Sequence, residues 1–196
     1  TDAGGAMGSS LYMSNQILNQ ENNYTMKDVY LGPKFSNKQI KNTLDKKGAK
    51  YEKFERKKLI EKAAGLLEEY KVISLFQGRM EWGPRALGNR SILANPKKRE
   101  TMDIVNKKVK HREEFRPFAP VVHEEKASEY FDIDYRSPYM TFVFDVKPEK
   151  KGEIPAVTHV NGTARIETLR RERNKFYYDL IDQFEANTGT PVLLNT

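Results

Sequence analysis

Residues 72–96, VISLFQGRMEWGPRALGNRSILANP, carry the strongest local signals in the chain. The stretch opens on the apolar run VISLF and closes on SILA, and three glycines, a proline and three arginines lie between these runs. A continuous apolar run bounded by glycine is typical of a buried strand. The glycine-rich segment favours a loop whose backbone N–H groups can approach a ligand. The pattern therefore predicts two strands joined by a long basic loop.

Helix and strand patterns alternate on both sides of this stretch. Helices are predicted at 36–46, where Ser36 and Gln39 have capping-box spacing, and at 55–70, 97–109, 123–130 and 171–186. Further strands are predicted at 29–35, 51–54, 119–122, 139–146 and 191–195, with a hairpin at 156–169 around Asn161-Gly162. Such interleaving predicts an α/β domain of the mixed α+β kind, with helices packed on a mixed sheet.

The composition is that of a basic globular protein. The 196 residues include 34 Lys and Arg against 27 Asp and Glu, which gives a formal net charge of +7. This balance suits anionic partners such as nucleotides, phosphates or nucleic acid. The chain has no Cys, no apolar run near the roughly 18 residues that span a bilayer, and no secretory-signal pattern. We therefore expect a cytoplasmic protein with no membrane partner.

Basic side chains gather in three loop segments. Arg79, Arg85 and Arg90 lie in the glycine-rich stretch, Lys110, His111, Arg112 and Arg116 lie in VKHREEFRPFAP at 109–120, and His159 and Arg165 flank the Asn161-Gly162 turn. Guanidinium groups suit phosphate or carboxylate ligands, and a proline-stiffened loop holds cations at fixed positions. Ordinary exposed charge, paired with acidic neighbours such as Glu81 or Glu113, is compatible with the same composition.

The N-terminal stretch has an unusual composition. TDAGGAMGSSLYMSNQIL at 1–18 predicts a turn followed by a helix of small residues, which favours close packing against another element. We interpret it as a remnant of a preceding domain. Asp2 in the glycine-rich turn is either a metal ligand or the N-cap of this helix.

Several common catalytic motifs are absent from the sequence. It contains no P-loop, no GxGxxG and no GxSxG pattern. The three histidines, His111, His123 and His159, are too dispersed for a HExxH-type zinc motif.

Four segments, in this order, resemble the C-terminal domain of the NodU/CmcH-type O-carbamoyltransferase family. They are GRMEWGPRALGNRSILANP at 78–96, VKHREEFRPFAPVV at 109–122, AVTHVNGTARIET at 156–168 and NTGTPVLLNT at 187–196. The opening DAGGAMGSSLY resembles the end of that family's N-terminal domain, which has the acetate-kinase/Hsp70-type ATPase fold. The resemblance covers essentially the whole chain. It implies that 1–22 are the last helix of the N-terminal domain plus a linker, and that 23–196 form a YrdC-like twisted mixed sheet.

The resemblance also implies an ATP-dependent carbamoyl transfer. Carbamoyl phosphate gives carbamate, which attacks the α-phosphate of ATP to form carbamoyl-AMP and pyrophosphate. The N-terminal domain, with a divalent metal (Fe or Mg), then transfers the carbamoyl group to a hydroxyl of a sugar, antibiotic or related small molecule. The implied partners are these small molecules and the N-terminal domain of the same protein, with no nucleic acid. Bringing two polyanions together requires several fixed cations.

Four basic residues match the family's ligand-binding positions and are the expected catalytic residues. The resemblance assigns Lys110 and Arg116 to the phosphates, and Arg85 and Arg165 to carbamoyl phosphate. It implies that Arg79, Gly83, Asn89 and Arg90 line the site, that His159 lies close to the nucleotide or carbamoyl group, and that Asp2 is the metal-ligand aspartate.

The chain departs from the family pattern in two respects. The pattern continues after LLNT with Ser-Phe-Asn, whose Ser and Asn belong to the nucleotide site, whereas this sequence stops at Thr196. Asn161 and Glu167 stand where Asp and Gln are more usual. We therefore expect that this chain alone does not complete adenylate synthesis or O-carbamoylation.

Two other functions are compatible with a basic chain of this type. A nucleic-acid-binding module would use Phe115 and Phe118 beside Arg116 for stacking and charge, although no RNA-binding fingerprint is present. A tRNA-modifying, threonylcarbamoyl-adenylate synthase-like enzyme is the other alternative. The helix remnant that precedes the domain argues against the latter.

Overall fold

The computed structural model describes residues 4–196. Its helices are α1 (Gly4–Tyr12), α2 (Asn37–Lys46), α3 (Arg56–Glu68), α4 (Arg99–Ile104), α5 (Ala127–Tyr130) and α6 (Lys175–Thr188), with π-helical turns η1 (Met13–Ile17) and η2 (Val105–Lys110) and 3-10 turns η3 (Glu124–Lys126) and η4 (Pro148–Lys150). Its strands are β1 (Ile73–Phe76), β2 (Arg90–Ala94), β3 (Ala119–His123), β4 (Phe144–Asp145), β5 (Thr163–Ala164), β6 (Glu167–Leu169) and β7 (Val192–Asn195).

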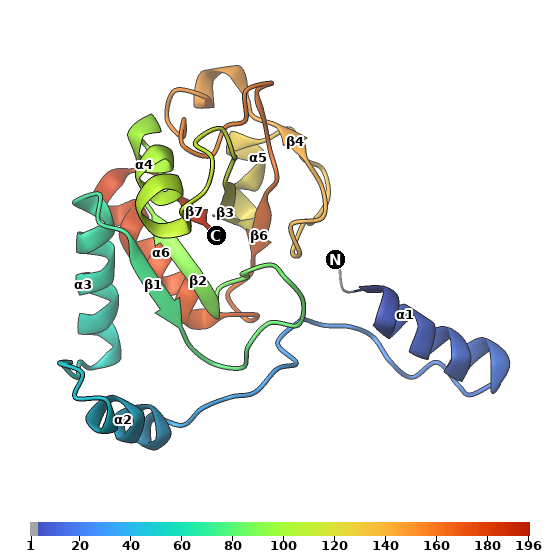
Figure 1. The fold of residues 1–196 in the computed structure, drawn as a ribbon. Coiled ribbons are helices and arrows are strands. Elements are labelled where there is room, and N and C mark those ends of the chain that lie inside the picture. The colour runs from blue at the N-terminus through green and yellow to red at the C-terminus, as the bar shows by residue number, and fades with distance from the viewer. Residues whose placement is uncertain (1–3) are drawn as a thin grey trace.

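A five-stranded sheet forms the centre of the molecule (Figure 1). The strand order is β1-β2-β7-β3-β6, and only the pair β3 and β6 is parallel. β4 and β5 form a separate two-stranded ladder. The mixed α/β class predicted from the sequence is confirmed.

Both faces of the sheet are buried, so consecutive residues of the central strands are apolar. In β7, Leu193 faces α3 and α6, whereas Leu194 faces the opposite layer. Successive side chains of a strand point to opposite faces, and β3 divides Val121 and Val122 in the same way. Burial on both sides explains why PVLLN is a continuous apolar run.

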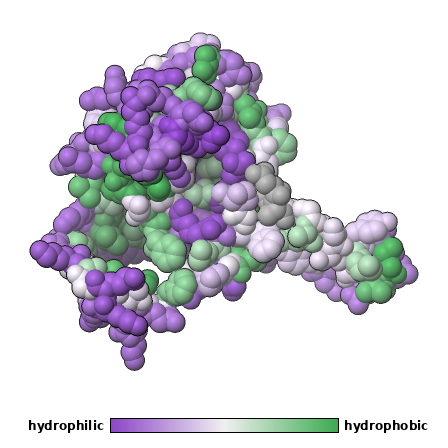
Figure 2. Space-filling model, viewed as in Figure 1, coloured by the Kyte–Doolittle hydropathy of each residue, from purple (hydrophilic) through white to green (hydrophobic). Residues whose placement is uncertain are grey.

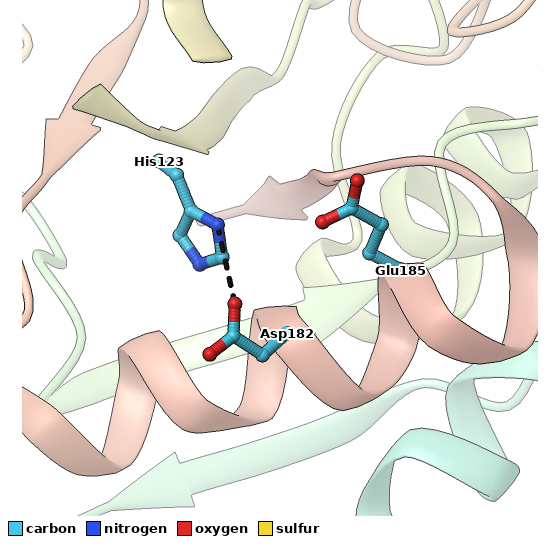
Figure 3. A group of neighbouring side chains, drawn as sticks. All are labelled: His123, Asp182 and Glu185. Atoms are coloured by element: carbon cyan, nitrogen blue, oxygen red, sulfur yellow. Dashed lines mark ion pairs between the residues drawn. The ribbon is translucent and has the colours of Figure 1, made fainter. Parts of the chain in front are cut away.

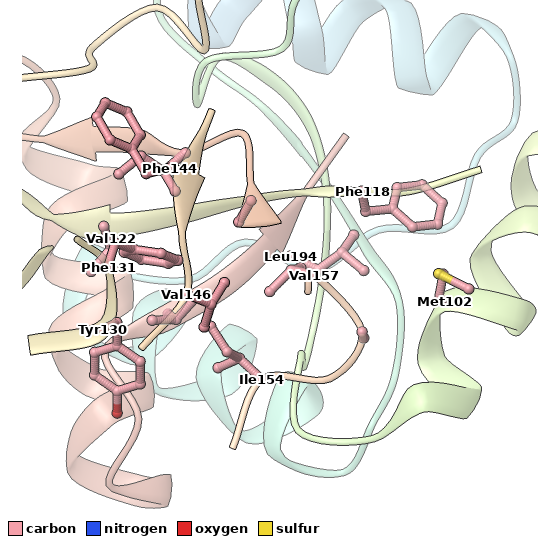
Figure 4. Packing of buried hydrophobic residues seen from close by; sticks show 14 of the residues in the cluster. Met102, Phe118, Val122, Tyr130, Phe131, Phe144, Val146, Ile154, Val157 and Leu194 are labelled. Atoms are coloured by element: carbon pink, nitrogen blue, oxygen red, sulfur yellow. The ribbon is translucent and has the colours of Figure 1, made fainter. Parts of the chain in front are cut away.

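The layer opposite α3 and α6 contains the larger apolar cluster (Figure 4). Aromatic and aliphatic side chains from separate segments meet on this face, among them Phe118, Phe131, Phe144 and Ile154. The same cluster includes Met102, on the helix that leads toward the basic segment at 109–120. This packing fixes the position of that segment relative to the sheet.

Helix ends were predicted well where a capping residue marks them. The Ser36 hydroxyl accepts from the backbone N–H of Gln39, and the Gln39 side chain accepts from the backbone N–H of Ser36, which completes the predicted capping box. At the other end of the chain, Gly189 terminates α6 in the left-handed conformation.

Two of the predicted extended segments are wrong for most of their length. The alternating stretch 139–146 forms a strand only at Phe144–Asp145, because its partner strand β5 has only two residues. The Phe142 ring packs edge-on against the Tyr135 ring near the surface. The predicted hairpin at 156–169 does not form, since Ala156 and Val157 pack into the core as part of a turn.

Three shorter strand predictions also need correction. Residues 51–54 have no regular structure, and 29–35 contribute only an isolated bridge between Lys34 and Arg79. The predicted strand at 72–76 forms as β1, but it lies at the edge of the sheet and Phe76 is half exposed, beside the Phe35 ring.

The N-terminal helix projects from the body of the molecule (Figure 1). α1 contributes no buried residue, and hydrophobic side chains gather at the far end of the projection (Figure 2). Among residues 4–196, none of the helices combines the length and apolar character needed to cross a bilayer.

Candidate functional site

A cleft of about 380 Å³ lies where the glycine-rich loop, the basic segment and the end of β7 meet. Its basic lining residues are Arg85, Arg90, Lys110, Arg112 and Arg165. The described lining contains no acidic residue. The volume is within the usual range for small-molecule sites. A concentration of cations in a concave site attracts anionic ligands.

The Glu81 carboxylate organises the glycine-rich loop from within. Glu81 is buried, and its Oε1 accepts hydrogen bonds from the backbone N–H groups of Leu87 (2.7 Å), Asn89 (2.7 Å) and Arg90 (3.1 Å). Its Oε2 accepts from Nε of Arg90 at 2.9 Å. Three backbone donors and one guanidinium around a single carboxylate fix the loop path.

Arg90 has a structural part in this arrangement. Besides the ion pair with Glu81, its Nη2 donates to the backbone carbonyl oxygens of Glu81 (2.9 Å) and Gly83 (3.1 Å). These bonds close the loop around Pro84 and Arg85. The arrangement therefore presents Arg85 at the cleft on a rigid support.

Gly88 allows the same loop to lie directly on α6. Its φ is +97°, and a Cβ atom at this position would lie 2.4 Å from Cδ1 of the buried Tyr177. Only glycine combines this backbone conformation with so close an approach.

Lys110 reaches the cleft from the end of a helix whose hydrogen bonding changes from the α to the π pattern. α4 continues into the π-helical turn η2, Lys110 is its last residue, and His111 follows with a left-handed backbone (φ 48°). π-Turns and non-glycine residues with positive φ are both frequent at functional sites. Burial, followed by the nearby Arg112 guanidinium, lowers the pKa of Lys110. A bound anion would relieve this repulsion.

Buried Asn106 holds the segment that follows. Its Oδ1 accepts from Nε of Arg112 at 2.7 Å, and its Nδ2 donates to the carbonyl oxygens of Glu114 and Arg116. The Arg112 guanidinium also lies over the Phe118 ring, 4.7 Å from its centroid. These contacts hold the loop in place, as expected for a segment that contains Pro117 and Pro120.

Arg165 enters the cleft from the short connection between β5 and β6. The nearby His159 is half-buried, and its Nδ1 lies 3.1 Å from Oγ1 of Thr163. Burial, and after it the Arg165 charge, lowers the pKa of His159. The Arg165 charge therefore affects the pKa of His159, although His159 does not line the cleft.

Asn195, which lines the cleft, forms a buried pair with the carboxyl group of Glu167, which does not line it. Nδ2 of Asn195 donates to the Ala86 carbonyl oxygen (3.0 Å) and to Oε2 of Glu167 (2.8 Å). Since both partners are acceptors, the amide orientation is fixed, and Oδ1 of Asn195 has no hydrogen-bond partner among the described residues. The contact with Ala86 ties the end of β7 to the residue next to Arg85.

Glu167 stands in this pair as a neutral acid. Burial is the largest influence and raises its pKa to about 8, against the opposing effects of Arg173 and Asn195. A protonated carboxyl group has an O–H donor beside an acceptor oxygen, and the carboxamide of Gln likewise has an NH2 donor group beside an acceptor oxygen. The departure from the more usual Gln is therefore conservative below pH 8.

We predict that Glu167→Gln stabilises the fold in a pH-dependent way. A carboxyl whose pKa is raised by folding contributes its full stability below its unfolded pKa of 4.5 and loses it as pH rises toward about 8. The parent chain loses about 1.4 kcal/mol per pH unit across this window, and the variant does not. Urea unfolding at pH 5 and pH 8.5 should show the two chains diverging at the higher pH. Parallel pH profiles would contradict the assignment.

The structure brings together some of the predicted site residues and separates others. Arg85, Lys110 and Arg165 line the cleft, together with Gly83 and Arg90. Arg116 does not line it. Nε of Arg116 pairs with Oε2 of Glu113 at 3.1 Å on the surface.

Three other predicted site residues also lie outside the lining. Arg79 donates to the carbonyl oxygens of Leu31 and Gly32, which anchors the chain that precedes α2. Asn89 is buried and joins Arg79 to Asn174 through hydrogen bonds. His159, as described above, faces Thr163. Asp2, the predicted metal ligand, lies outside the described residues.

Arg112, Met140 and Asn195 are among the cleft residues that sequence reasoning missed. Arg112 belongs to the basic segment and could have been chosen with Lys110. Met140 has a left-handed backbone (φ 52°), and no local pattern in the sequence marks it. Asn195 appeared only as part of a strand.

The aromatic pair proposed for nucleic-acid stacking is divided by the fold. Phe115 is exposed, whereas Phe118 is buried against Arg112 and in the core. A buried ring cannot stack on a base, so this feature gives no support to an RNA-binding surface.

Comparison with known proteins identifies related chains. Residues 64–196 match the family described as Carbamoyltransferase C-terminus. Nodulation protein NolNO of Sinorhizobium fredii is 43% identical over 199 residues, which cover all of this chain and 29% of that protein. Nodulation protein NolO of Bradyrhizobium diazoefficiens is 41% identical over 199 residues, all of this chain and 36% of that protein.

An uncharacterised Synechocystis protein, sll1178, is 41% identical over 223 residues, which cover all of this chain and 36% of that protein. The chain thus spans about a third of the length of these curated relatives.

Proposed function

The chain belongs to the carbamoyltransferase C-terminus family, and we propose that its basic cleft binds carbamoyl phosphate and activates it with ATP for transfer to a hydroxyl group. The observation that carries the proposal is the convergence of Arg85, Lys110 and Arg165, from three separate segments, on one cleft. Acceptor binding and the transfer step, with a sugar, antibiotic or related small molecule as acceptor, would belong to other parts of such an enzyme.

The proposed reaction has two steps. Water first displaces phosphate from carbamoyl phosphate and gives carbamate. A carbamate oxygen then attacks the α-phosphorus of ATP, the bond to the β-phosphate breaks, and carbamoyl-AMP and pyrophosphate form. Cations that are already fixed in place stabilise the charge that develops on the transferring phosphoryl group without having to reorganise.

The cleft residues have distinct parts in this proposal. Arg85, on the loop that Glu81 fixes, and Arg165 suit a bidentate interaction with the phosphate of carbamoyl phosphate. Lys110, whose pKa burial and Arg112 lower, supplies a compact charge for the nucleotide phosphates. Arg116 would have to break its ion pair with Glu113 before it could bind a nucleotide, so we propose that it contributes less to nucleotide binding than Lys110 does.

We predict that Arg85→Ala and Lys110→Ala each weaken carbamoyl phosphate binding about 5- to 150-fold, the equivalent of roughly 1 to 3 kcal/mol for a lost charged hydrogen bond. Isothermal titration of the 196-residue chain with carbamoyl phosphate measures the effect. Lys108→Ala is the matched control, because Lys108 is exposed on the same π-helical turn. Unchanged affinity in both cleft variants, or no binding by the parent chain, would overturn the proposal. Salt-dependent binding of generic RNA with no response to carbamoyl phosphate would support the nucleic-acid alternative instead.

A further inference from the structure

A second group of polar side chains lies away from the cleft, where β3 meets α6 (Figure 3). His123 is the last residue of β3 and is fully buried, and Asp182 and Glu185 lie three residues apart on α6. Residues at this spacing share one face of a helix. One ligand atom from each of the three side chains lies within 4.8 Å of the others.

The hydrogen bonding of the His123 ring determines which nitrogen carries the proton. Nε2 lies 3.2 Å from the backbone carbonyl oxygen of Tyr178. A carbonyl oxygen can only accept, so Nε2 carries hydrogen. Stacking on the Tyr178 ring, with centroids 3.9 Å apart and an interplanar angle of 18°, fixes the ring orientation.

The other nitrogen, Nδ1, is buried and has no hydrogen-bond partner among the described residues. It lies 3.6 Å from Oδ1 of Asp182 (Figure 3). This separation is longer than a hydrogen bond, so the Asp182 carboxylate does not satisfy Nδ1. A buried lone pair that faces a carboxylate is unfavourable unless a cation lies between the two.

We propose that His123, Asp182 and Glu185 form a binding site for a divalent transition metal, most favourably Zn²⁺, through Nδ1 of the imidazole and one oxygen of each carboxylate. Water would complete the tetrahedron. Metal–ligand bonds of about 2.0 to 2.1 Å place neighbouring tetrahedral ligand atoms roughly 3.3 to 3.4 Å apart, close to the observed 3.6 Å. The imidazole favours zinc or similar ions over the hard cations Mg²⁺ and Ca²⁺, which prefer oxygen ligands.

Two neighbouring groups shape this site. The Nε2–H bond to the Tyr178 carbonyl is the outer interaction that normally orients a metal-binding histidine. Lys126, in contrast, pairs closely with both carboxylate oxygens of Glu185. A metal ion must therefore displace the Lys126 ammonium group, so Lys126 is a competitor built into the metal-free chain.

The consequence of occupancy would be structural. None of the three residues lines the cleft, and Asp182 and Glu185 lie on the helix that covers the opposite face of the sheet from the main apolar cluster. An ion at this point would join the end of β3 to α6. A ligand that binds only the folded state raises its stability in proportion to the logarithm of ligand concentration.

The experiment is a titration of the chelator-treated chain with Zn²⁺ alone, in a non-coordinating buffer, followed by calorimetry and thermal unfolding. We expect one saturable site and a rise in Tm. Asp182→Asn and Glu185→Gln should each weaken binding at least tenfold. Lys126→Ala should strengthen it because the competitor is removed. Arg85→Ala, in the carbamoyl phosphate cleft, is the control and should leave zinc binding unchanged.

The design separates this proposal from the proposed function and from misfolding. The two carboxamide substitutions are on partly exposed helix positions, and circular dichroism will verify their folding. No saturable Zn²⁺ binding by the parent chain, or binding that neither carboxamide variant weakens, would refute the site. Weaker zinc binding by Lys126→Ala would also contradict it.

Discussion

Gly88→Ala should lower the Tm of the chain by about 4 to 24 °C. The positive φ of +97° is unfavourable for alanine, at a cost of roughly 1 to 3 kcal/mol. The added Cβ would lie 2.4 Å from the buried Tyr177 ring and 2.9 Å from Nδ2 of Asn174, and overpacking of a core adds roughly 1 to 3 kcal/mol. For a chain of this length, each kilocalorie per mole lowers Tm by about 2 to 4 °C.

Gly48→Ala is the matched control for this substitution. Gly48 also has a positive φ (+63°), but no atom lies within 4 Å of the position that the alanine methyl group would occupy. The control therefore carries backbone strain without overpacking, and the difference between the two variants measures the contact with Tyr177. Equal Tm losses in thermal unfolding would show that the contact between the added methyl group and Tyr177 does not destabilise the fold.

Glu81→Ala should destabilise the fold by about 3 to 5 kcal/mol, which is typical when one member of a buried charged pair is removed. The substitution leaves the Arg90 guanidinium without its carboxylate and three backbone N–H groups without their acceptor. Chemical denaturation by urea gives the free energy of unfolding directly.

Glu61→Ala is the control for the loss of a carboxylate. Glu61 lies on the exposed side of α3 and approaches Lys57 only at 4.0 Å, so its removal should change stability by less than about 0.5 kcal/mol. If Glu81→Ala were as mild as this control, the glycine-rich loop would not depend on the Glu81 carboxylate.

The sequence predicts the fold best where one residue determines local geometry. Ser36 caps the start of α2 as predicted, since capping depends on neighbouring backbone groups alone. The predicted strand at 139–146 is wrong for most of its length, because an alternating pattern indicates a half-buried segment but does not show that a partner strand is available. β5, the strand with which it pairs, is two residues long, and Val146 adds only an isolated bridge to Phe131.

In the candidate site, too, local sequence patterns were informative and tertiary contacts were not predictable. Arg85, Lys110 and Arg165 were predicted as site residues because they belong to segments with a recognisable pattern, and the fold places all three at one cleft. Arg116 could not be separated from Lys110 by sequence, because its pairing with Glu113 depends on how the loop closes around Asn106.

The metal site proposed at His123 could not be found from spacing. Its carboxylates are about sixty positions further along the chain, and the dispersed histidines suggested no zinc motif. Packing of α6 on the sheet brings the three side chains together.

The position of β7 has a consequence for biosynthesis. This strand, residues 192–195, lies between β2 and β3 and connects the two halves of the sheet. A ribosome delivers the chain from its N-terminus, so both neighbouring strands emerge long before the strand that joins them. Until then their inner edges have no partner and can pair with other chains. A nascent chain of this topology is therefore expected to depend on chaperones, or on rapid completion of translation, to avoid aggregation.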